Sequence, residues 1–337
     1  LTIGQHLDPS WQTAAFTINE ALGNVGETVW YSEPFSALPS DTETLDALAN
    51  DVAAGQVDTL IVIDCNPSYT RPDVFDDAAM LGRIPHRLHV GLHADETAMR
   101  SQWHLPLSHA LESWSDGRAV DGTVSIIQPV VSPLYATRSL HQVLDMIAGQ
   151  QASTNDAALR ATWRDTFGDS FDSRWMQALH TGFVDGEALQ PTPLTAKTPP
   201  APPAPDDAND QSLHIVFHPD PTIWDGRFAN IAWLQELPKP ISKLTWDNVV
   251  AISPALAEAQ ALSNGDLVEV AIGDRKVQGA AWIVPGQAAN TVVLTFGYGR
   301  RSGGEIARSG GYDAYAVRAS DDIWHARGTI ARIAGQY

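Results

Sequence analysis

A short polar loop follows the most apolar strand-like segment of the sequence. Residues 59–64 form a continuous apolar run, which is typical of a strand buried on both faces of a parallel sheet. Asn66 and Pro67 follow this run, and ligands of open α/β sheets bind at the carboxyl ends of strands. An Asn side chain both donates and accepts hydrogen bonds, and Pro restricts the loop backbone. The pair therefore predicts either a ligand-binding loop or an ordinary β–α turn, since Asn-Pro is also common turn chemistry.

A second polar group, formed by Asp95, Glu96 and Thr97, follows the next predicted strand at 87–92. Two acids at the start of a helical turn stabilise that turn in their own right, because they face unpaired backbone N–H groups. A binding role for these residues therefore needs support from outside the local pattern.

The single cysteine and the histidines of the chain do not form a pattern that predicts a catalytic or a metal-binding site. Cys65 is the only cysteine, so the chain forms no internal disulfide and no cysteine-ligated cluster. A catalytic Cys needs an adjacent base, and no His can be placed beside Cys65 from the sequence, so we interpret it as a small packed thiol. Five histidines fall within a short span, but their spacing matches no zinc pattern: His86, His89, His93, His104 and His109.

A glycine-rich segment at 297–304 contains Arg300 and Arg301. This composition is compatible with a loop that holds an anion and equally with a flexible surface loop. No strand, GxxxxGK[ST] motif and helix surround it in the order that a P-loop requires.

Residues 1–150 alternate between helix-like and strand-like patterns, which is typical of an open, mostly parallel α/β sheet. We expect a Rossmann-like domain over this range. Its predicted helices cover 11–22, 41–55, 72–81 and 139–148, and its predicted strands cover 28–31, 59–64 and 87–92.

The rest of the chain changes character twice. Residues 151–189 predict a helical extension with aromatic residues at helical spacing, and residues 190–212 predict an extended, proline-rich linker. Residues 213–337 contain short β-like segments separated by tight turn signals, which indicates a small β-barrel. Its predicted strands cover 213–217, 249–252, 267–271, 276–284 and 291–296.

The bulk composition excludes several classes of function. The net charge of −19 is opposite in sign to that of a nucleic-acid binder and disfavours an anionic membrane surface. No run of about 18 apolar residues is present, so we expect a soluble chain without a membrane span. Residues 1–4 have the pattern of a strand already under way, and we expect the chain to be an interior part of a longer protein.

Several segments together resemble the molybdopterin-oxidoreductase superfamily, and most closely the large iron–sulfur and molybdopterin-like subunit of alternative complex III. The resemblance covers most of the chain except the linker. The matching passages are 18–26, 57–63 with Asn66-Pro67, 95–97 with 103–106, 111–114, 121–129, 233–240, 244–248 and 264–266.

The resemblance implies a more detailed architecture. Residues 1–150 are then the third domain of the superfamily, and residues 213–337 are its fourth domain, a double-psi β-barrel that resembles a molybdopterin-dinucleotide-binding domain. In relatives with a cofactor, these domains hold half of a bis-molybdopterin guanine dinucleotide. The positions near the dinucleotide correspond to Asn66, Pro67, Asp95, Glu96 and Thr97.

The resemblance also implies a function, which is a cofactor-free scaffold within a respiratory quinol-oxidising complex. Iron–sulfur clusters are then expected only in the rest of the parent chain. The implied partners are the ferredoxin-like domain of that chain and the other subunits of a membrane-bound complex, on the periplasmic face. The alternative is a fragment of an active molybdopterin guanine dinucleotide-dependent oxidoreductase. An autonomous nucleotide-binding α/β enzyme is disfavoured, because no glycine fingerprint follows the first strand.

Overall fold

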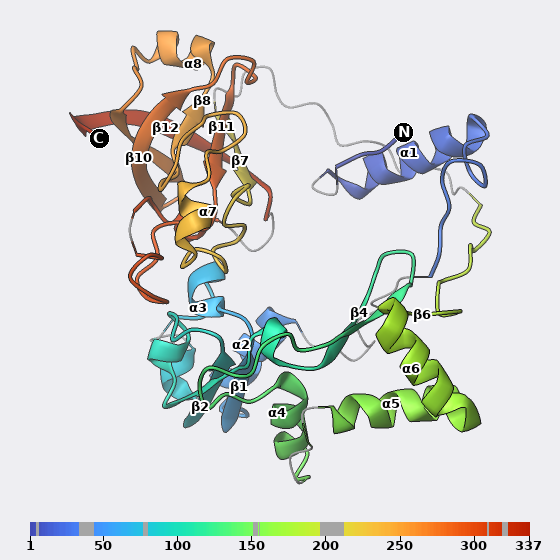
Figure 1. Cartoon of the computed structure of the whole chain (residues 1–337). Coiled ribbons are helices and arrows are strands. Elements are labelled where there is room, and N and C mark those ends of the chain that lie inside the picture. Colours follow the sequence, from blue (N-terminus) through green and yellow to red (C-terminus); the bar gives the residue numbers. More distant parts are fainter. Residues whose placement is uncertain are drawn as a thin grey trace. The chain divides into compact units, whose positions relative to one another are not determined.

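The computed structural model describes residues 1–4, 7–33, 44–76, 80–150, 154, 156–195, 212–308, 310–318 and 323–337. The chain divides into two compact units, each built from two separate stretches of sequence (Figure 1). Unit 1 combines Leu1–Thr42 with Pro106–Asp207, and unit 2 combines Glu43–Leu105 with Ala208–Tyr337. The units therefore interleave along the chain, whereas the sequence predicted consecutive ranges.

A small sheet forms the first part of unit 2. Strands β1 and β2 are parallel, with Ile63 opposite Val90, and β3 lies beside β2. Helix α2 packs against this sheet region through Val52, which joins the buried cluster of Phe75 and Ile84. A parallel sheet was expected here and is confirmed. Its elements are α2 (Leu45–Ala53), β1 (Thr59–Ile63), α3 (Pro67–Thr70), η1 (Leu81–Arg83), β2 (His86–Gly91), η2 (Ala98–Arg100) and β3 (Trp103–Pro106).

Two local expectations for this sheet were wrong. Strand β1 is not buried on both faces, because only Val62 is fully buried in a sheet of three strands. The helix predicted at 72–81 is absent from its described residues, and α3 forms earlier, at Pro67–Thr70. Pro67 begins this helix because a first helical position needs no N–H donor and a Pro φ angle is already helical.

The second part of unit 2 is a closed six-stranded barrel with the strand order β10-β8-β11-β7-β12-β9. The pairs β10–β8 and β11–β7 are parallel, and the other neighbours are antiparallel. The expected barrel is thus confirmed, while the double-psi topology stays a prediction. The elements are β7 (Leu213–His218), α7 (Ala232–Glu236), β8 (Val250–Ile252), α8 (Pro254–Ala259), β9 (Asp266–Ile272), β10 (Arg275–Ile283), β11 (Thr291–Thr295), η5 (Ala314–Val317) and β12 (His325–Gln336).

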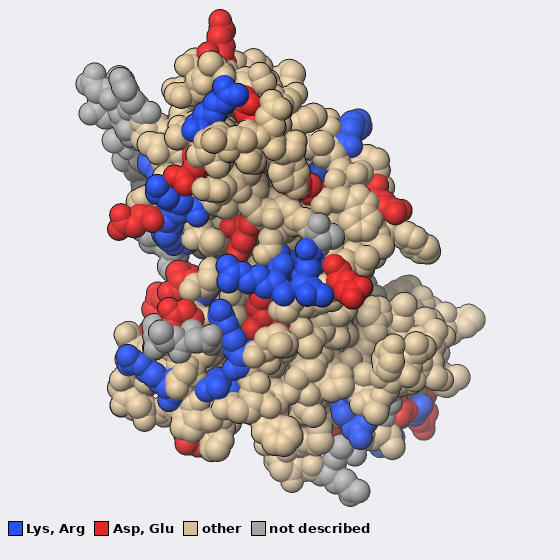
Figure 2. Space-filling model, turned by 90° about the vertical axis from the view of Figure 1, so that its left-hand side faces the viewer, with Lys and Arg blue, Asp and Glu red and all other residues tan. Residues whose placement is uncertain are grey.

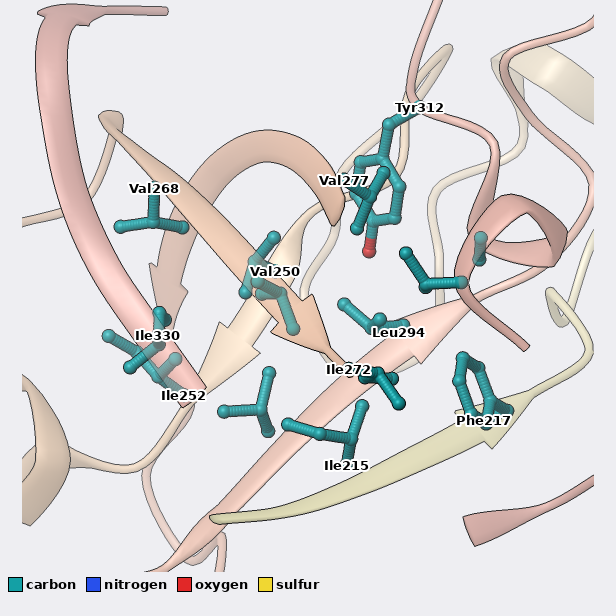
Figure 3. Packing of buried hydrophobic residues seen from close by; sticks show 14 of the residues in the cluster. Ile215, Phe217, Val250, Ile252, Val268, Ile272, Val277, Leu294, Tyr312 and Ile330 are labelled. Atoms are coloured by element: carbon teal, nitrogen blue, oxygen red, sulfur yellow. The ribbon is translucent and has the colours of Figure 1, made fainter. Parts of the chain in front are cut away.

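Alternating residues of the barrel strands fill its interior. In β9, Val268 and Val270 are fully buried while their neighbours are partly exposed, as a period of two requires. Figure 3 shows the apolar side chains of several strands, among them Ile215 and Leu294, gathered inside the barrel. Each such side chain stabilises the fold by roughly 1.5–3 kcal/mol through its removal from water.

Unit 1 has a separate core. Aromatic residues of α5 and α6 stack on one another, and Phe171 lies 5.7 Å from Trp175 between ring centroids. The helical pattern predicted within 151–189 is therefore observed, whereas the strand predicted at 28–31 is reduced to a single bridge between Val25 and Val29. The elements are α1 (Pro9–Ala21), η3 (Ala110–Glu112), β4 (Ser115–Arg118), β5 (Val124–Ile127), α4 (Leu140–Ile147), α5 (Ala157–Phe167), η4 (Gly168–Ser170), α6 (Phe171–Thr181) and β6 (Phe183–Val184).

Three further observations are not specific to one unit. Most of the predicted linker at 190–212 lies outside the described residues. Within the described residues, no helix has the length and apolar character needed to cross a bilayer. On the face that Figure 2 shows, basic and acidic side chains are interspersed among uncharged residues.

Candidate functional site

The loops that follow β1 and β2 meet in unit 2 through Asn66 and Thr97. The Thr97 hydroxyl donates to Asn66 Oδ1 over 2.8 Å, and the Thr97 backbone N–H donates to the same oxygen over 3.1 Å. The Thr97 hydroxyl oxygen accepts in turn from Ser68 N, at 3.1 Å. Parallel strands place their carboxyl ends at one edge of the sheet, which brings these loops together.

Asp95 and Pro67 have local structural roles in this site. Asp95 Oδ1 accepts from the backbone N–H groups of Thr97 and Ala98, at 3.1 and 3.0 Å, and so caps the start of η2. Burial raises the pKa of the Asp95 carboxyl, which those bonds only partly offset. Pro67 is buried at the start of α3.

The Glu96 carboxylate forms the centre of the site. Its Oε1 accepts from the backbone N–H groups of Arg301 and Ser302, at 2.8 and 3.0 Å. Its Oε2 accepts from Asn66 Nδ2 at 2.7 Å and from Arg300 Nη2 at 2.8 Å. Arg300 Nε lies 3.1 and 3.2 Å from the two carboxylate oxygens, so the guanidinium contacts both of them. Every oxygen of this buried group is thus well bonded.

The electrostatics of Glu96 follow from these contacts. Burial alone would raise its pKa, but the Arg300 guanidinium, the Asn66 amide and the Arg301 N–H outweigh burial and lower the pKa to about 2. The Glu96 carboxylate is therefore ionised at every physiological pH.

Arg300 connects the sheet loops to the barrel. Its Nη1 donates to the Gly226 carbonyl at 2.6 Å, and its guanidinium lies over the Tyr69 ring, 4.6 Å from the centroid. The Tyr69 hydroxyl donates to the Tyr298 carbonyl at 2.6 Å. In Figure 1, α3, which contains Tyr69, lies next to the loops of the barrel. The loop after β1, the loop after β2 and the segment after β11 thus form one network.

The glycine-rich segment 297–304 therefore binds an anion, and that anion is a side chain of the same chain. Gly299 has a φ of +67°, and a Cβ there would lie 2.3 Å from Asp313 N, so only Gly permits this path. Arg300 was not identified as a partner of Glu96 from the sequence. The arginines and glycines were a visible signal, but a contact across 204 positions leaves no local pattern.

Two of the five histidines, the buried His89 and the half-buried His104, form a pair beside this site. His89 is 1% exposed, and its Nδ1 lies 2.9 Å from His104 Nδ1. His89 Nε2 faces Asp95 Oδ1 at 3.6 Å. Burial lowers the pKa of His104, and the neighbouring His89 lowers it further. A single proton fits between the facing nitrogens, so the pair is stable when His104 is neutral.

The other candidate groups do not complete a reactive centre. Cys65 is exposed, so the expectation of a packed thiol was wrong. Desolvation, with the charges of Asp64 and Asp95, raises the pKa of this thiol, which disfavours the reactive thiolate. His109 belongs to unit 1, where it caps η3. Within the described residues, no three His, Cys, Asp or Glu side chains are grouped as metal ligands.

The arrangement does not fit the role of Asn66, Glu96 and Thr97 as dinucleotide contacts. Their polar atoms bond one another and the segment at 300–302. The donors suited to a phosphate, namely the Arg300 guanidinium and two adjacent N–H groups, are occupied by Glu96. A dinucleotide would have to displace a carboxylate of the protein itself.

Comparisons with known proteins give a fold and no family. No family model matches the sequence, and no curated protein matches it. Among solved structures, acetylene hydratase from Pelobacter acetylenicus superposes with a TM-score of 0.64 at 12% identity. The match covers 86% of this chain and 46% of that chain, so this chain spans about half the length of that structure. At this identity the likeness is one of fold alone.

Proposed function

We propose that this chain is a cofactor-free scaffold within a molybdopterin-oxidoreductase-like subunit of a respiratory quinol-oxidising complex, as in alternative complex III. The observation that carries this proposal is the Glu96 carboxylate, which occupies the anion-binding donors of Arg300, Arg301 and Ser302. These donors are thereby occupied by a side chain of the protein itself. In this proposal the site stabilises the packing of the sheet against the barrel.

The proposed partners are proteins. They are the iron–sulfur, ferredoxin-like part of the same parent chain and the other subunits of a membrane-bound complex, on the periplasmic face. Exposed apolar residues on the segment between β7 and β8 support a protein partner, because Trp233 is 83% exposed and Ile241 is 81% exposed. Large exposed apolar side chains that lie on one segment are a common feature of interaction surfaces.

The second candidate is a fragment of an active molybdopterin guanine dinucleotide enzyme. The fold likeness to acetylene hydratase favours it. In this case Asn66, Asp95, Glu96 and Thr97 would contact the dinucleotide, and Glu96 would have to leave Arg300.

Analysis of the parent protein purified from its own cells separates the two candidates. The measurements are molybdenum and tungsten content by mass spectrometry, and pterin fluorescence after acid oxidation. We expect iron from clusters but far less than one molybdenum, tungsten or pterin per chain. One equivalent of metal with pterin would overturn the scaffold proposal.

A nucleotide titration tests the autonomous-enzyme alternative. Isothermal titration of this chain with GDP, GTP and ATP is expected to give no saturable heat. Glu96→Ala is the matched comparison, because it frees the donors of Arg300 and its neighbours. Tight binding by the unaltered chain would contradict the proposal.

A further inference from the structure

A pocket of about 330 Å³ lies on the barrel and is separate from the Glu96 network. Its volume falls at the lower end of the range typical of small-molecule sites. Apolar side chains dominate its wall, and its polar lining residues include Lys239, Asp247, Asn248 and Gln287. Characteristic lining residues are Lys239, Ile241, Leu244, Ala251, Trp282 and Val293.

Three adjacent strands form one wall of this pocket. Ala251 pairs with Trp282 of β10 on one side and with Val293 of β11 on the other. Its neighbours Val250 and Ile252 are fully buried in the barrel core, so Ala251 faces away from that core. Because Ala251 is small, it leaves room for a ligand between Trp282 and Val293.

Lys239 is one of the residues that line the pocket, and its ammonium is incompletely bonded. This residue is only 7% exposed. Its ammonium donates to the Tyr298 hydroxyl at 2.8 Å and lies 3.2 Å from Asp220 Oδ2. An ammonium has three N–H donors, and within the described residues Lys239 Nζ has no further partner. A buried donor without an acceptor is unfavourable, so this ammonium favours a ligand that supplies one.

The surroundings of Lys239 determine which acceptor fits. Asp220 is fully buried and balances the ammonium charge, and its Oδ1 already accepts from Thr222 and Ile223. Asp247 also lines the pocket, and burial raises its pKa. The carboxyl groups of Asp220 and Asp247 disfavour a negatively charged ligand at this position. A neutral oxygen does not bring a second negative charge beside them.

We propose that this pocket binds a small, neutral, apolar molecule whose carbonyl oxygen accepts a hydrogen bond from Lys239 Nζ. The apolar body lies against Trp282, Ala251 and Val293, and the carbonyl points toward the ammonium. This site uses no residue of the Glu96 network and does not depend on the scaffold function.

Prodan, a neutral naphthyl ketone whose emission reports polarity and hydrogen bonding, is a suitable probe. The matched control compound is 2-dimethylaminonaphthalene, which lacks the ketone. Fluorescence titration of the protein is expected to show one saturable prodan site, with affinity about tenfold higher than that of the control compound, since a hydrogen bond to a charged donor contributes at least this factor.

Variants locate the site. Ala251→Leu fills the pocket without entering the barrel core and is expected to reduce prodan affinity about tenfold or more. Lys239→Met is expected to reduce prodan affinity to that of the matched compound. Lys243→Met is the control, because Lys243 is an exposed Lys of the same segment whose ammonium donates to the Pro240 carbonyl. It should leave both affinities unchanged.

Circular dichroism of each variant accompanies the titrations. If Lys239→Met does not fold, the difference in affinity between the two compounds on the unaltered protein tests whether the carbonyl contributes to binding. The Ala251→Leu variant then tests whether the ligand binds in this pocket. The proposal is overturned if prodan does not saturate at one equivalent, if Ala251→Leu binds as before, or if the two probes bind equally well.

Discussion

Two buried ion pairs of unit 2 differ in how fully their partners are bonded. Glu96 and Arg300 satisfy each other, and backbone and amide donors complete the set. Lys239 and Asp220 are also buried, yet among the described residues Asp220 Oδ2 accepts no hydrogen bond beside its ion pair, and Lys239 retains a donor. A saturated pair can only hold structure together, whereas an unsaturated pair beside a pocket can still bind a ligand. Burial of a charge is therefore not by itself a sign of function.

The largest effect is expected from Glu96→Ala. It leaves the Arg300 guanidinium and two N–H groups buried without their acceptor, and loss of one partner of a buried pair costs about 3–5 kcal/mol. Urea unfolding at pH 7 measures the change. Glu305→Ala removes an exposed acid of the neighbouring segment and should change the free energy of unfolding by less than about 0.5 kcal/mol. Equal changes in the free energy of unfolding for the two variants would show that the Glu96 network does not stabilise the fold.

Acid is expected to weaken the same pair with a definite sign. The folded pKa of Glu96 is about 2, below the ordinary value of 4.5, so its contribution is fully present above pH 4.5 and is lost as the pH falls toward 2. The loss is on the order of 3 kcal/mol. Comparison of unfolding free energies across this range for the unaltered protein and Glu96→Gln measures it. Parallel curves for the two proteins would refute the assignment.

Asp313 offers a buried carboxyl without such a set of donors. Burial raises its pKa to about 7. The folded protein therefore favours the protonated carboxyl, and stability falls as the pH rises from about 4 to 7. Asp313→Asn retains an acceptor for Tyr315 N and is expected to stabilise the protein at pH 8 by about 2 kcal/mol, after allowance for partial exposure. Thermal unfolding at pH 5 and pH 8 tests this, and a lower midpoint for Asp313→Asn at pH 8 would contradict it.

The smallest effect concerns the pair of His89 with His104. Because the pKa of His104 is lowered from 6.5, the folded state favours neutral His104, and stability falls as the pH drops below 6.5. We expect His104→Asn to cost about 1 kcal/mol at pH 7 and to flatten the curve between pH 7 and 5. His86→Asn, at an exposed position of β2, is the control. A curve for His104→Asn as steep as that of the unaltered protein would exclude the pair as the titrating group.

Sequence patterns predicted part of the candidate site. The loops at Asn66 and at 95–97 were selected because both follow strands, and the structure brings Asn66 within hydrogen-bond distance of Glu96 and Thr97. Their main partner, Arg300, could not be predicted, since 204 positions separate it from Glu96. The pocket was not predicted either. An alanine such as Ala251 gives no sequence signal for a binding site, and the wall of the pocket forms only when three strands pair in register.

The sequence by itself determined the barrel class and many, though not all, of the local elements, because alternation in segments such as 266–272 and turn residues act between near neighbours. It also determined the unbalanced charge, which is a property of composition alone. Only the tertiary structure decided which stretches share a unit, and which buried charges are saturated. These outcomes depend on contacts between residues far apart in the chain, and the energy of a buried charge is set by the partners that folding brings to it.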